Sequence, residues 1–232
     1  MTIEEMVDAV QLGLQKIDSF ARDDFTPDEI VHYLNQAQLE FIKDRFQGQN
    51  ESGFEETPKR TADLQEIVAT EPLIPVLEAT SVILGSQYEV LLPYPDPYMF
   101  FVYLELGLTR TANPVIASKT YVPCKPGVHG REQFYRVVAG QHSPYIRNPI
   151  VLFREGFMHI FTDVDTTVED GRLTFVRQPD DLLLDQVDPT SSISSELAVH
   201  THFDIVNIAI RIMMDDLADN TQSRSQLEME QS

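Results

Sequence analysis

One cysteine and a nearby histidine are the first side chains to consider for chemistry. Cys124 is the only cysteine, so no intrachain disulfide can form, and His129 follows five residues later. A thiol becomes a nucleophile when an adjacent base takes up its proton. Pro123, Pro126 and Gly127 lie around this pair and indicate a loop. The sequence also lacks a G-x-S-x-G motif and a glycine-rich phosphate loop. We therefore expect a partly buried, inert thiol and a protein that is not an enzyme.

Two histidines, His200 and His202, form an H-x-H pair. On a strand, both imidazoles would face the same side and could bind a metal ion together. The pair precedes a predicted helix instead, and no third ligand is evident. We expect both side chains to fill an interface at the helix start, and we predict no metal site and no cofactor.

Four acidic residues are grouped before Gly171. They are Asp163, Asp165, Glu169 and Asp170. Calcium binds to oxygen-rich loops of this kind. The spacing lacks the mid-loop glycine of an EF-hand, so we predict a solvated turn between two strands.

The chain as a whole is strongly acidic. Among 232 residues, 37 are Asp or Glu and 17 are Lys or Arg, which gives a formal net charge of −20. Such a chain is not expected to wrap nucleic acid by neutralising phosphates. No apolar run approaches the roughly 18 to 20 residues that span a bilayer, and the first residues carry no signal-type core. We expect a soluble protein with no membrane partner.

The central part of the chain has the opposite charge. Residues 110–154 contain seven basic residues and one acidic residue, Glu132. This segment packs against the acidic remainder of its own subunit, or it contacts an acidic surface on a neighbour, where complementary charge sets register. Both can hold at once. The candidate interface residues in it are Arg131, Arg136 and Arg147.

Two helices are predicted at the N-terminus. Thr2 and Glu5 form a capping box at the start of the first. Thr26 and Glu29 form the second, and Pro27 takes the first helical position. The buried stripes are Met6, Val10, Leu14 and Ile17, and then Ile30, Leu34, Ala37 and Phe41. A short connection between the helices favours an antiparallel pair, and Gly48 is a plausible helix stop.

The middle of the chain alternates strand-like runs with turn signals. Strands are predicted at residues 88–92, 98–108, 120–122, 150–153, 157–162 and 173–176. Glu155-Gly156 predicts a hairpin turn, and Asp170-Gly171 predicts a second turn. Residues 131–139 predict a short helix.

A last helix is predicted over residues 202–218. Thr201 can cap it, and Asp204 in its first turn interacts favourably with the helix dipole. Its apolar residues fall on more than one face, which indicates contact with the chain's own helices and with an adjacent subunit. The candidate interface residues on it are Phe203, Ile210 and Met213. The polar tail, residues 220–232, is predicted to be flexible.

These elements predict an α+β fold. We expect a single domain over residues 1–232, in which a small helical bundle receives an inserted antiparallel β-rich subdomain. The predicted helical part covers residues 1–78 and 196–219, and the β-rich part covers residues 84–190.

Three segments, in this order, resemble a known family. The first is Phe25 to Gln38, a capped helix with a Leu-Asn-x-Ala-Gln pattern. The second is Asp63-Leu64, then a strand ending at Leu92-Pro93, then Tyr98 leading the next strand. The third is the helix start from Thr201 to Ile210. Together they resemble the head-to-tail connector proteins of short-tailed bacteriophages, the adaptor or tail-tubular ring proteins, and the ring proteins of crAss-like phages.

The resemblance implies a structural virion protein that forms a dodecameric ring below the portal and links capsid to tail. Its helical part would pack against neighbouring copies or the portal protein. Its β part would contact the next ring or a tail protein. Phage DNA would pass through the channel as non-specific cargo during ejection. The location implied is the portal vertex or tail neck of the virion, after assembly in the host cytoplasm.

Other functions fit the same composition. The chain could be another neck, stopper or baseplate component of a virion. A non-viral interaction module would be a stable monomer or dimer with a non-viral partner. A hydrolase with an acidic site would lose its activity when one carboxylate is replaced.

Overall fold

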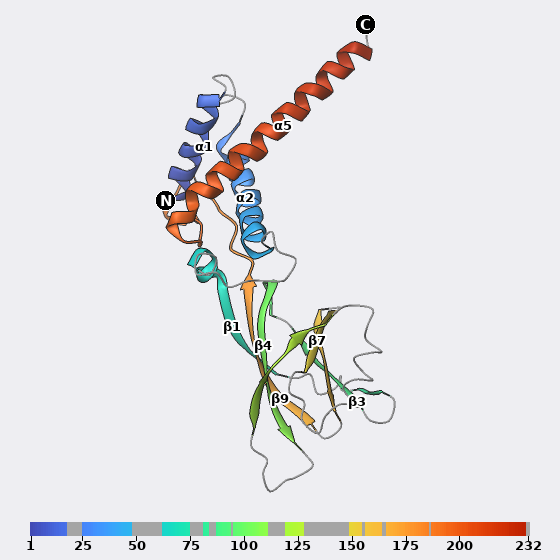
Figure 1. Ribbon diagram of the computed structural model, residues 1–232. Helices are drawn as coiled ribbons and strands as arrows, with labels where there is room; N and C mark the ends of the chain where they lie inside the picture. The colour runs from blue at the N-terminus through green and yellow to red at the C-terminus, as the bar shows by residue number, and fades with distance from the viewer. Residues whose placement is uncertain are drawn as a thin grey trace. The chain divides into compact units, whose positions relative to one another are not determined.

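The computed structural model shows an α+β fold (Figure 1). It describes residues 1–17, 25–47, 62–74, 81–83, 87–93, 95–110, 119–127, 149–154, 156–163, 166–185 and 187–230. The chain divides into two compact units. The helical unit comprises Met1–Ile67 and Gln178–Ser232, and the β unit comprises Val68–Arg177. The β unit is therefore an insertion between two parts of the helical unit.

Both N-terminal helices begin at the predicted capping boxes. Helix α1 is Ile3–Ile17 and helix α2 is Pro27–Gln47. The amide of Thr2 donates to Glu5 Oε2 at 2.9 Å, and the amide of Glu5 donates to Thr2 Oγ1 at 3.3 Å. Thr26 and Glu29 make the same reciprocal pair at 2.7 and 3.3 Å. The predicted stripes are buried at Met6, Val10, Leu14, Ile30, Leu34, Ala37 and Phe41. The Ile17 side chain and Gly48 lie outside the described residues.

Helix α5, His202–Glu230, packs against both N-terminal helices. Its buried apolar side chains in the described part are Ile205, Val206, Ala209 and Met213. Tyr33 on α2 donates its hydroxyl to Asp216 Oδ2 on α5 at 2.8 Å. On the α1 side, a Cβ added at Gly13 would lie 2.3 Å from Ile210 Cδ1, so the glycine permits a close approach of the two helices.

Two predictions for this helix are wrong. The helix continues to Glu230 rather than ending near Ala218, and no glycine or proline follows Thr201 to stop it. Thr201 does not cap it either. Its hydroxyl and its amide both donate to the carbonyl of Ala198 at 2.8 Å. These bonds close a 3-10 turn, η6 (Val199–Thr201), that leads directly into α5.

The described residues of the β unit form two sheets, in strand orders β1-β9-β4-β5 and β2-β3-β8-β7-β6. All pairs are antiparallel except β6 with β7. The strands are β1 Val68–Leu73, β2 Ser81–Ile83, β3 Gln87–Pro93, β4 Tyr98–Arg110, β5 Thr120–Pro123, β6 Lys125–Pro126, β7 Ile150–Arg154, β8 Phe157–Asp163 and β9 Thr166–Arg177. The short 3-10 helix η2, Gln65–Ile67, immediately precedes β1, and η5, Pro189–Ser191, lies after β9.

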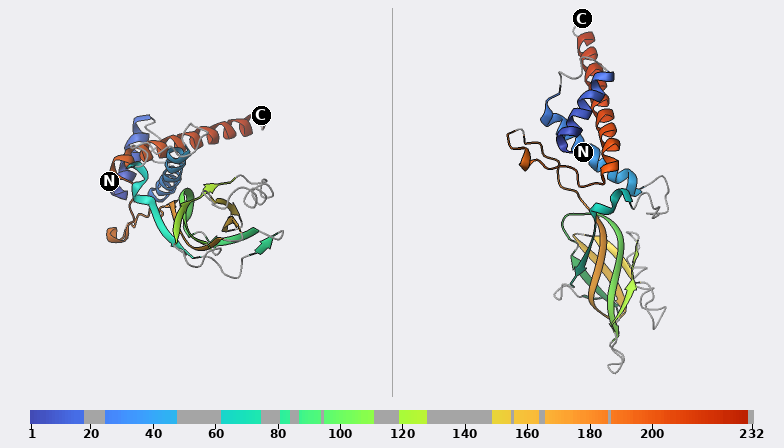
Figure 2. Two further views of the ribbon diagram at one scale, coloured as in Figure 1. Left: turned by 60° about the horizontal axis from the view of Figure 1, so that its bottom comes forward. Right: turned by 90° about the vertical axis from the view of Figure 1, so that its left-hand side faces the viewer.

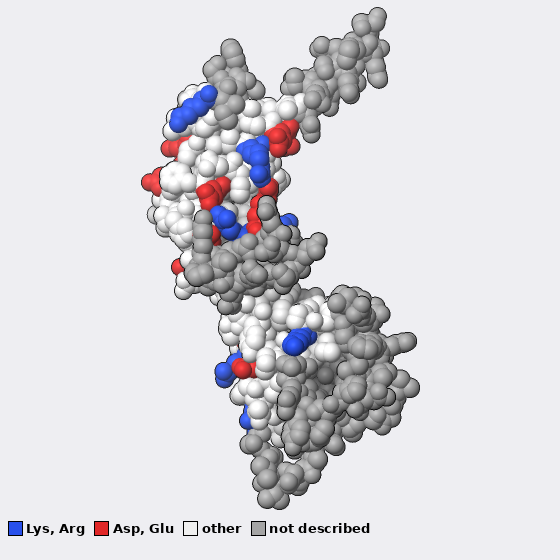
Figure 3. Space-filling view, in the orientation of Figure 1, with Lys and Arg blue, Asp and Glu red and all other residues white. Residues whose placement is uncertain are grey.

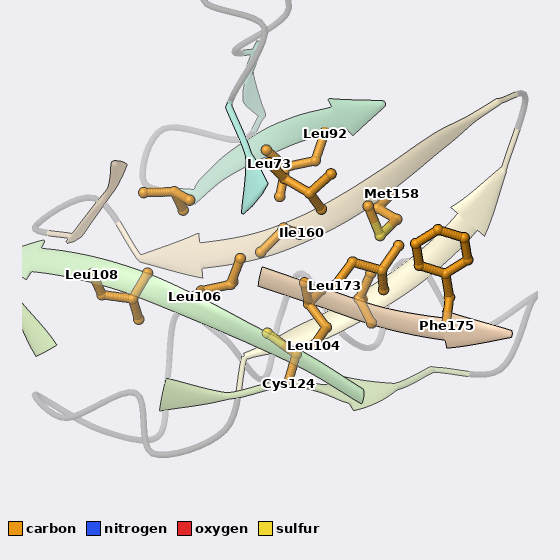
Figure 4. Close-up of a cluster of buried hydrophobic side chains, with 12 residues drawn as sticks. Leu73, Leu92, Leu104, Leu106, Leu108, Cys124, Met158, Ile160, Leu173 and Phe175 are labelled. Carbon is orange, nitrogen blue, oxygen red and sulfur yellow. The ribbon is translucent and has the colours of Figure 1, made fainter. Parts of the chain in front are cut away.

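The core of the β unit lies between the two sheets, whose strands can be followed from further sides in Figure 2. Leu104, Leu106 and Leu108 alternate along β4 and face inward, as the two-residue period of a strand requires. Met158 and Ile160 reach the same cluster from β8 in the other sheet (Figure 4). The unit is therefore a sandwich with a core of its own.

Most strand predictions are confirmed, including the hairpin between β7 and β8. Gly156 at its turn has φ +83°, a conformation that glycine adopts without strain. The turn predicted at Asp170-Gly171 is wrong, because β9 runs through it without a break. A Cβ at Gly171 would lie 3.2 Å from Leu106 Cδ2 on the neighbouring strand. This glycine therefore serves close packing and not a turn.

The unit boundaries differ from the predicted ones. We predicted the β part over residues 84–190, whereas the β unit begins at Val68 and ends at Arg177. The β unit begins at Val68 and not at residue 84 because strand β1 pairs with β9 along its whole length. Residues 178–190 belong to the helical unit, where Asn35 bonds to the backbone of Leu182. The helix predicted at 131–139 lies outside the described residues.

Candidate interaction surfaces

Cys124 lies in the core of the sandwich (Figure 4). Its side chain is more deeply buried than we predicted, and its amide donates to the carbonyl of Leu104 at 2.8 Å. Burial raises the pKa of the Cys124 thiol to about 12, since the thiolate would lose its hydration. The thiol is therefore held in its neutral form near neutral pH. His129 lies outside the described residues.

The two histidines of the H-x-H pair have separate environments. His200 Nε2 lies 2.7 Å from Asp63 Oδ1. His202 is buried within the helical unit, and its Nε2 donates to the carbonyl of Leu197 at 2.9 Å. The interface role predicted for His202 is therefore wrong, because its ring packs inside its own subunit. No group of three or more potential metal ligands occurs in the part of the chain that the structure describes.

Glu169 and Asp170 of the acidic cluster lie on strand β9 and pair with Lys119, so the solvated turn predicted for these two residues is wrong. Asp170 Oδ2 accepts a hydrogen bond from Lys119 Nζ at 2.5 Å, and Glu169 Oε2 lies 4.0 Å from the same nitrogen. The hydrogen bond to Asp170 raises the pKa of Lys119. A Cβ at Gly107 would lie 2.1 Å from Asp170 Oδ1, so the glycine leaves room for this pair. The Asp163 side chain and Asp165 lie outside the described residues.

The predicted interface residues divide into three groups. Phe203 is 63% exposed and remains available for a contact. Ile210 is half-buried beside Gly13, and Met213 is fully buried within its own subunit. Arg131, Arg136 and Arg147 lie outside the described residues.

A polar network around one buried carboxylate in the helical unit was not predicted. The carboxylate of Asp63 is 2% exposed and lies 3.1 Å from Arg45 Nε. Arg45 also donates to Asp204 Oδ2 at 3.0 Å, and its guanidinium stacks on the Phe41 ring, 4.8 Å from the centroid. With His200, these contacts tie α2, the segment before β1 and α5 together. The partners are far apart in the sequence, so spacing gave no signal for them.

Residues 178–201, named here the acidic loop, project from the helices (Figure 2). Their base is held on α2. Asn35 Nδ2 donates to the carbonyl of Leu182 at 3.1 Å and its Oδ1 accepts from the Leu182 amide at 2.7 Å. Gln38 is bonded to the carbonyl of Asp180 at 3.3 Å and to the hydroxyl of Ser195 at 2.7 Å. The base of the loop is therefore firmly anchored.

The tip of the acidic loop is ordered by its own side chains. Leu183 and Ile193 form an antiparallel bridge with two backbone hydrogen bonds of 2.8 and 3.0 Å. The Asp185 carboxylate accepts from the amides of Val187 and Asp188 at 2.8 and 3.0 Å, and from Ser191 Oγ at 2.6 Å. These hydrogen bonds lower the pKa of Asp185.

Apolar side chains are exposed on this ordered loop. Leu183 is 50% exposed, Ile193 39% and Val187, near the tip, 94%. The loop also contains five acidic residues and no lysine or arginine. It therefore combines apolar contact area with negative charge.

Charge is divided unevenly between the two units. The helical unit contains 26 acidic and 8 basic residues, whereas the β unit contains 11 acidic and 9 basic residues. Figure 3 shows both kinds of charge over the described surface of the helices. Almost the whole net negative charge therefore belongs to the helical unit.

Comparisons with known proteins add no family. No protein-family model matches the sequence, and a search of curated proteins gave no match. Among the described residues, no helix has both the length and the apolar character needed to cross a membrane.

Proposed function

We propose that this chain is a non-enzymatic subunit of a closed ring in the head-to-tail connector of a bacteriophage. The ring lies below the portal protein, links capsid to tail and surrounds DNA as it passes. The observation that carries the proposal is the arrangement of the chain. A helical unit built from both ends of the chain is interrupted by an antiparallel β insertion. The resemblance to connector ring proteins implies that division of parts.

The segments that carry the resemblance fall on structural elements that fit it. The capped segment from Phe25 to Gln38 covers the start of α2, where the capping box is formed. The segment from Thr201 to Ile210 covers the start of α5. Asp63, in the second segment, is the buried carboxylate that lies beside Arg45 of α2 and His200, just before α5. The first and third segments and Asp63 therefore belong to the helical unit, whereas Leu92-Pro93 and Tyr98 lie on β3 and β4 of the β unit.

The charge distribution supports association between unlike surfaces of neighbouring copies. The helical unit is strongly acidic, while residues 110–154 of the β unit hold seven basic residues and one acidic residue. A contact between two different surfaces of the same chain is heterologous, and heterologous contacts generate rings when the rotation closes. An acidic helical unit would also not adhere to DNA phosphates that pass it.

The proposal is tested on particles of the phage that encodes this chain. Quantitative mass spectrometry of purified particles should find the chain in a fixed ratio to the portal protein. A reconstruction of the neck should show a closed dodecameric ring with this fold below the portal. A ring elsewhere in the tail would instead support a stopper or baseplate role. Absence from particles, with a monomer in the host cytosol, would overturn the proposal.

A further inference from the structure

We infer that the acidic loop is a docking surface for a second copy of this chain, and that its occupant is the copy's basic stretch, residues 131–147. The inference rests on the proposed ring. It specifies which two surfaces of neighbouring copies contact each other.

The loop is preorganised for binding. Its base is fixed on α2 through Asn35 and Gln38, and its tip is fixed by the Asp185 carboxylate. A surface that is already ordered loses little conformational entropy when a partner binds. Leu183, Val187 and Ile193 are therefore presented on a defined backbone and not on a loop that must first be ordered.

The exposed apolar side chains indicate a contact with protein. Val187 is 94% exposed although its own amide and that of Asp188 donate to the Asp185 carboxylate, which also accepts a hydrogen bond from the Ser191 hydroxyl. Contiguous exposed apolar residues with polar surroundings are typical of interaction sites. Val199 and Phe203, one helical turn apart at the end of the loop and the start of α5, are also exposed, at 68% and 63%.

Charge identifies the occupant. The loop has five acidic residues and no lysine or arginine. Beside it lies a hollow of about 370 Å³ that is lined by three carboxylates and no cation. Its lining residues are Glu4, Val7, Asp8, Gln11, Pro27, Leu184 and Asp185. A partner for this surface needs positive charge together with apolar area.

The basic stretch has that composition. Residues 131–147 contain three arginines and one acidic residue, Glu132. Between the arginines lie Phe134, Tyr135, Val137 and Val138. A second copy presents this stretch at the same concentration as the loop, and the resulting contact joins two different surfaces, as a ring requires.

The test uses two variants of the full chain with reversed charge. One is Asp180→Lys/Asp181→Lys, whose side chains are exposed and do not hold the tip of the loop. The other is Arg131→Glu/Arg136→Glu/Arg147→Glu. Self-association is measured by sedimentation and native mass spectrometry at low salt. Each variant alone should weaken the association constant by roughly tenfold or more.

Mixing the two variants separates contacts between copies from contacts within one chain. In an equimolar mixture, each acidic loop meets an intact basic stretch, and each reversed loop meets a reversed stretch. The mixture should therefore regain wild-type association. If the stretch binds the loop of its own chain, mixing restores nothing, because each chain keeps its own mismatch.

Matched controls exclude general effects of charge and folding. Asp44→Lys/Asp215→Lys makes the same charge change at exposed positions on α2 and α5 and should associate like the wild type. Leu183→Ser/Val187→Ser removes apolar area without a charge change and should weaken association. All variants should keep the wild-type circular dichroism spectrum and melting temperature.

Three results would overturn the inference. They are a wild-type chain that stays monomeric at its highest soluble concentration, loop variants that associate like the wild type, and a mixture that regains nothing. None of these results would contradict the proposed ring, because the composition of the particles tests that proposal separately. Conversely, absence from particles would overturn the ring proposal while the measured self-association stood.

Discussion

At the scale of single residues, glycines mark positions where neighbouring strands and helices need space. Gly107 on β4 lies under the ion pair between Lys119 and Asp170, and a Cβ there would lie 2.4 Å from Lys119 Cε. Gly171 meets Leu106 on the adjacent strand. Both positions are set by contacts across the sheet, so neither has a local turn to reveal its role in the sequence.

Gly107→Ala should break this ion pair and destabilise the β unit. The new methyl group forces both side chains out of their present rotamers, at a cost of about 1 kcal/mol in the free energy of unfolding. Denaturant titration measures the change. Because the loss acts through the pair, Gly107→Ala should cost much less in a Lys119→Ala background. Equal costs in both backgrounds would show that the ion pair is not what the glycine accommodates.

At the scale of elements, a buried carboxylate joins α2 to α5. Arg45→Met would leave the buried Asp63 carboxylate with the His200 contact but without the Arg45 guanidinium, and we expect a loss of about 2 kcal/mol in the free energy of unfolding. Adding Asp63→Asn removes the buried charge and should recover part of that loss. Chemical denaturation of both single variants and the double variant gives the coupling energy. Asp44→Ala, next to Arg45 but exposed, is the control and should change little. Additive effects would contradict the proposed coupling.

The elements also show how far sequence reasoning reaches in this chain. The capping boxes at Thr2 and Thr26 and the hairpin at Gly156 were predicted correctly, because each depends on partners only a few residues apart. The acidic loop was not, since its anchor Asn35 is 147 residues from Leu182. The ion pair between Arg45 and Asp63 was not predicted for the same reason. Sequence signals between nearby residues predict helices and strands. The anchoring of the acidic loop depends instead on contacts between residues that are distant in the sequence.

At the scale of the whole molecule, the chain has two units with separate cores. The β unit is continuous in sequence from Val68 to Arg177, and its hydrophobic cluster contains residues of both of its sheets. The helical unit requires both ends of the chain, because α5 completes the packing of α1 and α2. This asymmetry predicts that one unit folds alone and the other does not.

A fragment of residues 68–177 should therefore fold independently, with Cys124 as an internal reporter. In the full chain, the thiol with its pKa raised to about 12 should resist alkylation at pH 8 and react readily in denaturant. The fragment should show the same protection and a cooperative melting transition.

The raised pKa of Cys124 also sets the sign of a pH effect on stability. The contribution of the buried, protonated Cys124 thiol to stability should be fully present below the unfolded thiol pKa near 9 and should be lost as pH rises toward 12. Cys124→Ala should unfold without this alkaline loss, apart from the contributions of other groups. A fragment whose thiol reacts at the denatured rate would show that the β unit needs the helical unit to fold.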